Sequence, residues 1–525
     1  MKDPHQQPPI DFPPALRNSI ANMSPTAQVI NASPSPYQGD KVGDLISASE
    51  TTPKASRIDL ARFLSQSARN RPASVIRSLF PAEMIPGMLS LLAGKPNPDT
   101  FPFESLSLNL KPEAEAGPIS LTIQGEDLNV PLQYGATAGI PKLVQWITQL
   151  QTHMHKRDVV TPGSKLDGVA GRTPWRVTTG NGSQDLLHKT FDALLNPGDV
   201  ILVESPVYTG ILPSLVMLKV KIVPVESDDE GLMATRLAEM MEKWETNSVT
   251  AGLARPKCLY TTPTGANPAG TTASDDRKRQ ILALARQHDF LLLEDDPYYY
   301  LHFEGLDQDA VTRARPKSYW ALEEEHRERW GTGRVLRFES FSKILCAGIR
   351  IGFATGPNEI LDAVDANTAN SNLQPSGVSG VVAYTLLNYW GIPGFLRNVD
   401  NVARYYVKRR DNFEAKARKV LGEAGVARWV TPVAGMFLWL KLNLPPAGED
   451  TPEGDSFALI SDKAKAKGVL AVPGVAFIPD GSKTCYVRTS FSLIAEKDVE
   501  EAFKRLRDVV LEAWKEAGKE MPVLK

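Results

Sequence analysis

A lysine and an arginine seven residues apart are the first candidates for chemistry in this sequence. Lys343 follows two hydroxyl residues, Ser340 and Ser342, and Arg350 comes shortly before Gly352. An amine with a lowered pKa can attack a carbonyl and form a Schiff base. An arginine adds a charged, forked donor that suits a phosphate. Taken alone, the segment is better explained by a surface lysine, so the inference depends on the other motifs.

A run of acids follows one of the most apolar stretches of the chain. Glu294, Asp295, Asp296 and then Tyr298 come directly after Phe290–Leu293. Carboxylates buried behind such a strand cost free energy unless a cation accompanies them. A protonated pyridine nitrogen is one cation that would meet this need.

Three further motifs lie at expected turns. The segment 180–185 leads into a helix expected to end near Leu195, and the free N–H groups and dipole of its first turn would hold an anion such as phosphate. The loop 262–270 has two prolines and two glycines, which leave Asn267 as a fixed amide. Tyr208 follows a strand and could cover a flat cofactor. Singly, these motifs are also explained as a helix cap, a long turn and core packing.

Short apolar strands alternate with helices through the middle of the chain. The strand-like runs are 200–203, 221–225, 257–260, 290–293 and 333–338, and 277–288 is a helical stretch between them. This alternation is typical of an α/β fold with a mainly parallel sheet covered on both faces. Ligands of such sheets bind beyond the carboxyl ends of the strands, which is where the motifs fall.

The rest of the chain divides by composition. Residues 1–55 are rich in Pro, Ser, Asn and Gln, so we expect a mobile extension. Residues 305–333 are polar and charged, so we expect a solvated insertion. We expect a second, smaller α+β domain after Gly391, with strands at 436–440 and 484–488. The predicted parts are an N-terminal arm with part of the small domain (56–130), a large domain (131–390) and a C-terminal small domain (391–525).

Bulk properties exclude several classes of protein. A net charge of −2 and a pI near 6.4 argue against a nucleic-acid or anionic-membrane partner. Three scattered cysteines suit a reducing compartment, and neither end resembles a targeting signal, so we expect a cytoplasmic protein. His153 and His155 lie two apart, which on a helix directs them to different faces, so we expect no metal site. No apolar run approaches the roughly 20 residues of a membrane helix.

Together, and in this order, the motifs resemble those of the class I aminotransferases of fold type I, which depend on pyridoxal 5′-phosphate. The closer resemblance is to the aromatic-amino-acid, kynurenine and 2-aminoadipate aminotransferases, including fungal aromatic ones, over residues 57–520. Supporting matches are 92–98 with 101–103, 132–134 with 138–140, and 486–492. The resemblance implies a large domain with a mainly parallel seven-stranded sheet between helices, plus a smaller α+β domain.

The resemblance also assigns catalytic roles. Lys343 would bind the cofactor aldehyde covalently and then carry a proton between substrate and cofactor. Asp295 would pair with the ring nitrogen; it is preferred to Asp296 because the family pattern Asp-x-x-Tyr gives Asp295 and Tyr298. Tyr298 and Asn267 would hydrogen-bond to the phenolic oxygen of the ring.

Other positions carry binding roles by resemblance. The cofactor contacts implied are stacking by Tyr208 on the ring and phosphate binding by Ser183, Gln184, Ser340, Ser342 and Arg350. Arg488, helped by Asn267, would bind the substrate α-carboxylate. Tyr134 would reach the cofactor of a partner subunit, which implies a homodimer with shared sites. Arg77 and Gly94 match positions that line the side-chain pocket and its mobile cover.

The implied reaction is a ping-pong transfer of the amino group of an aromatic amino acid (Phe, Tyr or Trp) to a 2-oxo acid such as 2-oxoglutarate. Kynurenine and 2-aminoadipate are alternative donors. A different reaction of the same cofactor, such as C–S lysis, or a cofactor-binding regulator are further alternatives. The regulator would need a DNA-binding domain before the catalytic fold, and only about 55 low-complexity residues stand there. Ala93-Gly94-Lys95 stands where many relatives have two glycines, which bears on substrate choice.

Overall fold

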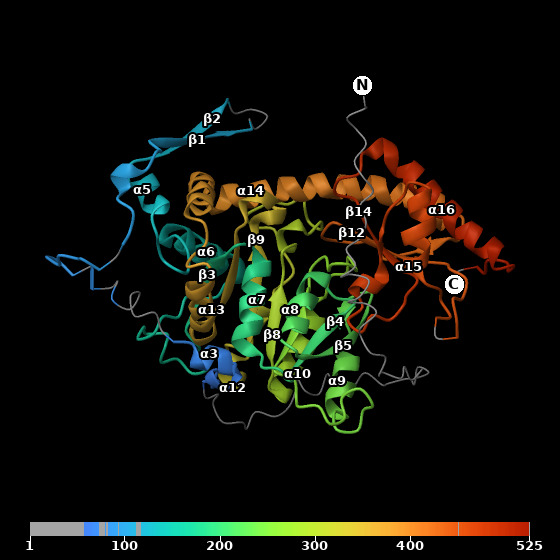
Figure 1. Ribbon diagram of the computed structural model, residues 1–525, viewed down its shortest axis with the longest axis horizontal. Coiled ribbons are helices and arrows are strands. Elements are labelled where there is room, and N and C mark those ends of the chain that lie inside the picture. The colour runs from blue at the N-terminus through green and yellow to red at the C-terminus, as the bar shows by residue number, and fades with distance from the viewer. Residues whose placement is uncertain are drawn as a thin grey trace.

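A computed structural model describes residues 57–72, 79, 82–83, 85–92, 94–111, 117–449 and 451–523. The expected mobile extension over 1–55 and the position of Arg77 lie outside these residues. The described chain holds a two-stranded hairpin, an eight-stranded sheet and a four-stranded sheet (Figure 1). The chain is therefore α/β, with its largest sheet enclosed by helices.

The large sheet is mostly parallel. Its strands, in spatial order, are β3 (Trp175–Gly180), β10 (Gly352–Pro357), β9 (Val335–Ser340), β8 (Leu291–Asp295), β7 (Cys258–Thr261), β4 (Val200–Ser205), β5 (Lys221–Asp228) and β6 (Gly231–Leu232). β10 runs antiparallel to both of its neighbours, and β6 runs antiparallel to β5. The five strands from β9 to β5 are parallel.

The sheet has eight strands rather than the seven expected. The additional strand, β6, has two residues and pairs with the end of β5 after a tight turn. Gly231 allows this turn because its φ is +86°, in the left-handed region. A strand of two residues is too short to show an alternating apolar pattern, so β6 cannot be predicted from the sequence.

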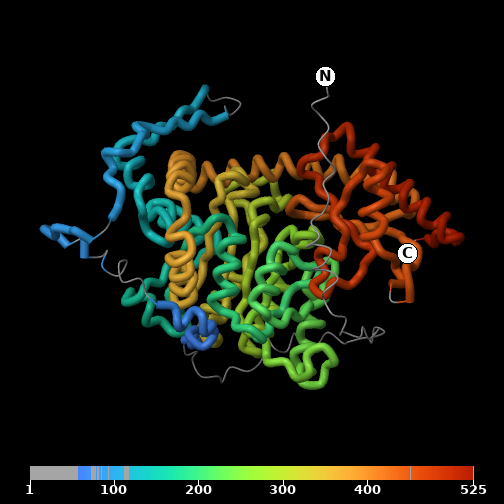
Figure 2. Tube along the Cα trace, viewed as in Figure 1, coloured from blue at the N-terminus to red at the C-terminus, as the bar shows by residue number. Residues whose placement is uncertain are grey.

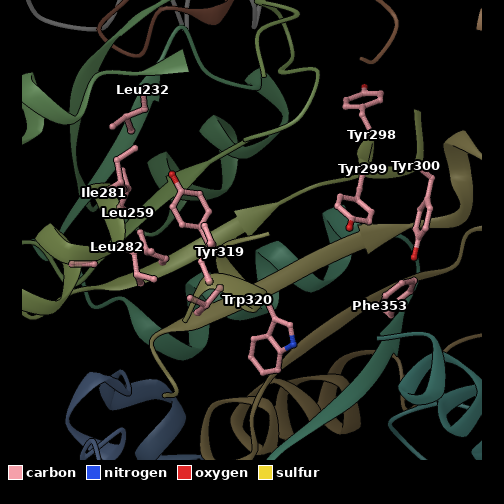
Figure 3. Packing of buried hydrophobic residues seen from close by; sticks show 14 of the residues in the cluster. Leu232, Leu259, Ile281, Leu282, Tyr298, Tyr299, Tyr300, Tyr319, Trp320 and Phe353 are labelled. Carbon is pink, nitrogen blue, oxygen red and sulfur yellow. The ribbon is translucent and has the colours of Figure 1, made fainter. Parts of the chain in front are cut away.

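Side chains of the central strands alternate between two helical layers. Leu291 and Leu293 pack in one cluster with α7 (Ser183–Leu194) and α13 (Asn358–Ser371). Leu292 packs in the other with α6 (Pro141–His155), α9 (Ala234–Glu242) and α10 (Asp275–His288). Figure 3 shows part of this second cluster. Burial on both faces explains why these strands read as continuous apolar runs.

The four-stranded sheet lies toward the C-terminus. Its strands, in order, are β11 (Ala427–Arg428), β12 (Phe437–Leu442), β14 (Tyr486–Ser490) and β13 (Val472–Pro473). The end of α14 (Gly377–Ala417) and α16 (Glu496–Glu516) pack against it. α14 bends at Gly391, whose φ is +58° and ψ is 179°. This bend falls where the smaller domain is predicted to begin, and the division into domains stays a prediction.

An N-terminal arm projects from the body. It consists of the hairpin of β1 (Ser105–Leu110) and β2 (Ile119–Gln124) and of α5 (Glu126–Leu132). Leu128 on the arm and Val381 on α14 belong to one small buried cluster, which anchors it. Figure 2 shows the arm in blue and the C-terminal segment in red at opposite ends of the molecule.

The expectation of a solvated insertion over 305–333 is wrong for its centre. Trp320, in α11 (Tyr319–Leu322), is fully buried and packs in the large core. Glu323 is also fully buried, and Arg157 binds its carboxylate at 3.0 Å. The guanidinium of Arg157 lies 3.6 Å from the centre of the Trp320 ring. Arg157, which is far away in the sequence, therefore neutralises the Glu323 carboxylate. Part of the acidic run 323–325 can thus be buried away from solvent.

Short helices complete the described chain. They are α3 (Gln66–Asn70), α8 (Leu212–Met217), α12 (Arg327–Trp330) and α15 (Ser456–Ala458), with turns η1 (Ala61–Phe63), η3 (Pro98–Thr100), η4 (Thr209–Ile211), η5 (Tyr299–Leu301), η6 (Phe341–Lys343), η7 (Ala347–Ile349), η8 (Arg418–Gly422), η9 (Leu459–Ala464) and η10 (Gly474–Phe477). Among the described helices, none is long and apolar enough to cross a membrane.

Candidate active site

Strand alternation separates the three acids at the end of β8. Glu294 and Asp296 point to one face of the sheet, where Nη1 of Arg337 lies 3.0 Å and 2.8 Å from their carboxylate oxygens. Asp295 points to the opposite face, the side on which Leu293 packs toward α7. The two flanking acids are therefore neutralised by an arginine that does not reach Asp295.

Asp295 is buried with one oxygen left over. Its Oδ2 accepts a hydrogen bond of 2.6 Å from the Tyr260 hydroxyl, and its Oδ1 has no hydrogen-bond partner among the described residues. Burial raises the pKa of Asp295 to about 7, and the hydrogen bond from Tyr260 opposes this rise. A buried carboxylate with a free oxygen fits a cation such as a protonated ring nitrogen.

Lys343 ends the turn that follows β9. It is half-buried, and its Nζ lies 6.0 Å from the centre of the Tyr298 ring. Burial lowers the pKa of Lys343, and the positive charges of Arg350 and Arg488 lower it further. A larger fraction of the amine is therefore unprotonated near neutral pH, which is the form that attacks an aldehyde.

The start of α7 forms a cradle for an anion. Arg350 reaches it, since its Nη2 donates to the carbonyl oxygen of Asn181 at 2.8 Å and its Nη1 donates to Oγ of Ser342 at 3.3 Å. Gly352 packs so closely that a β-carbon there would lie 2.3 Å from the backbone nitrogen of Ser183. Helix N–H groups, a hydroxyl and a guanidinium around one point fit a phosphate.

Two predicted phosphate contacts have other partners. Oγ of Ser340 accepts a hydrogen bond of 3.1 Å from the backbone nitrogen of Ser342. Nε2 of Gln184 donates to the carbonyl oxygen of Gly210 at 2.5 Å. The Gln184 side chain is therefore directed to the turn η4, and its backbone N–H is the donor that the helix start offers.

Tyr208 lies between the anion cradle and the acid. A β-carbon at Gly210 would overlap the Tyr208 ring, so glycine leaves room for that ring. Burial raises the pKa of the Tyr208 hydroxyl, the charge of Asp295 raises it further, and the charges of Arg488 and Arg350 lower it. The ring is thus surrounded by the groups predicted to bind the two ends of the cofactor and the substrate.

The guanidinium of Arg488 lies against two aromatic rings. Its guanidinium carbon lies 4.5 Å from the centre of the Phe437 ring and 5.0 Å from that of Phe477. Its Nη1 donates to Oδ1 of Asn267 at 2.8 Å, and its buried Nε has no partner among the described residues. Burial lowers the pKa of Arg488. A fixed fork with spare donors can bind a carboxylate through two bonds.

Some predicted residues are not brought into this cluster by the single chain. Tyr134 keeps 55% of its surface exposed on the arm. Gly94 is exposed, and no described atom lies within 4 Å of a β-carbon built there. Tyr298 is brought in, since it is buried and its ring packs edge-on against Phe437 at 5.9 Å.

Sequence reasoning missed several residues around the site. Tyr260 was assigned to a strand without a role, and the rings of Phe437 and Phe477 were not associated with Arg488. Arg337 was not identified as the partner of the acids. Alternation along β8 would have put Asp295 on a face of its own, but the register between strands is needed to find Tyr260.

Known proteins resemble this chain over most of its length. The family described as aminotransferase class I and II matches residues 133–506. Aminotransferase tdiD of Emericella nidulans is 42% identical over 435 residues, which cover 83% of this chain and 92% of that protein. The mitochondrial kynurenine/alpha-aminoadipate aminotransferase of Bos taurus is 35% identical over 460 residues, or 87% and 100% of the two chains. The crystal structure of the aromatic aminotransferase Aro9 from C. albicans superposes with a TM-score of 0.74, at 28% identity, over 88% of this chain and 100% of that one.

The fold and the site define a transaminase that depends on pyridoxal phosphate. This chain belongs to the family of class I and II aminotransferases. The residues fit the cofactor, because a phosphate cradle, a lysine and a buried acid with a free oxygen converge on the carboxyl-end edge of the sheet.

Proposed function

We propose that this aminotransferase transfers the amino group of an aromatic amino acid (Phe, Tyr or Trp) to a 2-oxo acid such as 2-oxoglutarate, by a ping-pong mechanism. The main observation in favour of an aromatic substrate is the position of Arg488, whose guanidinium lies beside the rings of Phe437 and Phe477. A carboxylate bound by Arg488 brings the rest of the substrate beside apolar rings. The similarity to an aromatic aminotransferase of known structure supports this proposal.

Pyridoxal phosphate, when bound, supplies an aldehyde for the amine and a ring that accepts electrons. Lys343 would hold the cofactor through its Nζ, and the same atom would take up and return the proton that moves during the transfer. Asp295 would hold the protonated ring nitrogen. Tyr298 and Asn267 would hydrogen-bond to the phenolic oxygen, and Tyr208 would cover one face of the ring.

The two ends of the site hold anions. Arg488 and Asn267 bind the α-carboxylate and so fix the amino group near Lys343. Each anion also lowers the net positive charge around that amine. The phosphate would be held by the first turn of α7, including the backbone N–H of Gln184, and by the side chains of Ser183, Ser340, Ser342 and Arg350.

Kynurenine and 2-aminoadipate are alternative amino donors, because a relative at 35% identity is named for both. 2-Aminoadipate has a second carboxylate, which would need another cation. The arginines whose charge acts on Lys343 are Arg350 and Arg488, and both already have an anion to bind. Arg77, which lies outside the described residues, would line the side-chain pocket. Gly94 would belong to the cover of the same pocket.

We also propose a homodimer in which Tyr134 completes the partner's cofactor site. The arm and the residues before it expose large apolar side chains, among them Leu89 at 94%, Phe103 at 52% and Val130 at 56%. Such a surface is typical of a protein interface. A cytoplasmic location remains part of the proposal. It rests on three cysteines that form no disulfide, although some relatives are named as mitochondrial.

A half-reaction screen tests the substrate class. Enzyme loaded with cofactor is mixed with one amino acid at a time, without any oxo acid, and the change in cofactor absorbance is followed. We expect Phe, Tyr and Trp to react faster than kynurenine, and 2-aminoadipate to react slowest. A fastest reaction with 2-aminoadipate would overturn the aromatic assignment. Regeneration by 2-oxoglutarate in the second half-reaction checks the acceptor.

A further inference from the structure

The hydroxyl of Tyr260 reaches Asp295 because of the register between two strands. Tyr260 of β7 pairs with Leu293 of β8, and Leu293 and Asp295 lie on the same face, two residues apart. The Tyr260 side chain therefore reaches diagonally to Asp295, where its hydroxyl donates to Oδ2 at 2.6 Å. Tyr260 is fully buried, so water does not compete for this bond.

Among the described residues, the bond from Tyr260 is the single hydrogen bond of the Asp295 side chain. Asp296 and Arg337 act from the other face of the sheet, and Lys343 acts from the turn after β9. The hydroxyls of Tyr208 and Tyr298 face the acid as well, since its charge raises the pKa of both. The side chain of Asp296 instead accepts a hydrogen bond of 2.8 Å from Nη1 of Arg337.

We propose that Tyr260 is a positioning residue, whose hydroxyl fixes Oδ2 of Asp295 so that Oδ1 is presented to the ring nitrogen of the cofactor. The inference rests on the proposed role of Asp295. A carboxylate held on one oxygen cannot rotate away, and a hydrogen bond donated to its charged form favours ionisation. Packing alone does not account for the tyrosine, because phenylalanine would pack equally well near Phe191, whose ring lies 6.4 Å away.

The matched pair of variants is Tyr260→Phe and Tyr300→Phe. Each removes one buried hydroxyl, but that of Tyr300 has no hydrogen-bond partner among the described residues. Figure 3 shows the Tyr300 ring in the core cluster. The readout is the dissociation constant of pyridoxal phosphate, measured by titrating each apo-protein from pH 6 to pH 9.

We expect Tyr260→Phe to weaken cofactor binding roughly tenfold at pH 6, as for a lost hydrogen bond to a charged group. The difference in cofactor affinity between this variant and the parent protein should decrease toward pH 9. Loss of the donor raises the pKa of Asp295, so the variant acid is protonated over a wider range at low pH, and both proteins have an ionised acid at high pH. Tyr300→Phe should match the parent protein throughout. An unchanged constant in Tyr260→Phe, or a loss that is equal at every pH, would overturn the proposal.

The variant Asp295→Asn distinguishes a failure of the proposal about Tyr260 from a failure of the proposed role of Asp295. If Asp295→Asn weakens binding strongly and Tyr260→Phe does not, Asp295 keeps its role and the inference about Tyr260 fails. If Asp295→Asn leaves the constant unchanged, the assignment of Asp295 fails and the inference falls with it. Weakening in both variants, with the pH dependence described, supports the inference.

Discussion

Nη1 of Arg488 donates a 2.8 Å hydrogen bond to Oδ1 of Asn267, and this bond joins the two large sheets of the chain. Arg488 lies in β14 of the four-stranded sheet, and Asn267 lies in the loop after β7 of the eight-stranded one. A backbone hydrogen bond joins the same two parts of the chain, because the nitrogen of Val207 donates to the carbonyl oxygen of Phe477 at 2.8 Å. The proposed carboxylate site therefore lies at the junction of the two sheets.

Arg488→Gln should weaken amino-acid binding. The variant keeps a donor for Asn267 and loses the charged fork, so KM for phenylalanine should rise roughly 10- to 100-fold. The affinity for pyridoxal phosphate should stay within about threefold, because the variant leaves the phosphate cradle intact. Steady-state kinetics and a cofactor titration measure the two effects. Arg505→Gln, on the exposed face of α16, is the control, and an unchanged KM in Arg488→Gln would contradict the assignment.

Lys343→Ala should reduce turnover by more than about 10³-fold and leave the fold intact. The variant removes the amine that we propose binds the cofactor covalently, while its neighbours keep their own contacts. Circular dichroism checks the fold, and borohydride reduction of the parent protein followed by peptide mapping locates the pyridoxyl group. A label on another lysine, or none, would refute the mechanism.

Asp295→Asn and Asp296→Asn should differ in cofactor affinity. Asp295 has a free oxygen, whereas Oδ2 of Asp296 is bound by Arg337 at 2.8 Å. We expect Asp295→Asn to weaken pyridoxal phosphate binding roughly 10- to 100-fold, and Asp296→Asn to change it less than about threefold. Equal losses of cofactor affinity in equilibrium titrations of the two variants would contradict the assignment of Asp295, rather than Asp296, to the ring nitrogen.

The apo-enzyme should be less stable than its Asp295→Asn variant at high pH. Burial raises the pKa of Asp295 from 3.8 to about 7, so the folded protein binds this proton more tightly than the unfolded chain does. The advantage of the variant should be absent below about pH 4, grow as pH rises, and level off above about pH 7, at no more than roughly 4 kcal/mol. Thermal unfolding of both apo-proteins from pH 4 to pH 8 measures it. A constant difference across that range would contradict the raised pKa.

Sequence patterns located the segments that form the site, but they did not predict which side chains contact one another. The acids at the end of β8, the loop with Asn267 and the segment of Lys343 each lie at or beside a strand, so local composition located them. Tyr260 could not be found this way, because its contact with Asp295 depends on the register of β7 against β8. Register is fixed by packing over the whole sheet, and one sequence does not reveal it.

The insertion shows the same limit for charged residues. Its acidic run was interpreted as a solvated surface because charge usually stays in water. Glu323 is buried since Arg157, 166 residues earlier, binds its carboxylate and the backbone nitrogen of Gly333 donates to Oε1 at 2.9 Å. No local pattern indicates that an arginine so far away will meet this acid.

Arg157→Met should therefore destabilise the fold strongly. It leaves the Glu323 carboxylate buried without its cation, which costs about 3–5 kcal/mol. Adding Glu323→Gln should recover part of this loss, because the amide oxygen can still accept from Gly333 and carries no charge. The control is Arg505→Met, which breaks an exposed pair with Glu501 one helical turn away and should cost less than about 1 kcal/mol. Urea unfolding of the four proteins measures the differences, and similar losses in Arg157→Met and Arg505→Met would mean that the pair with Glu323 does not stabilise the insertion.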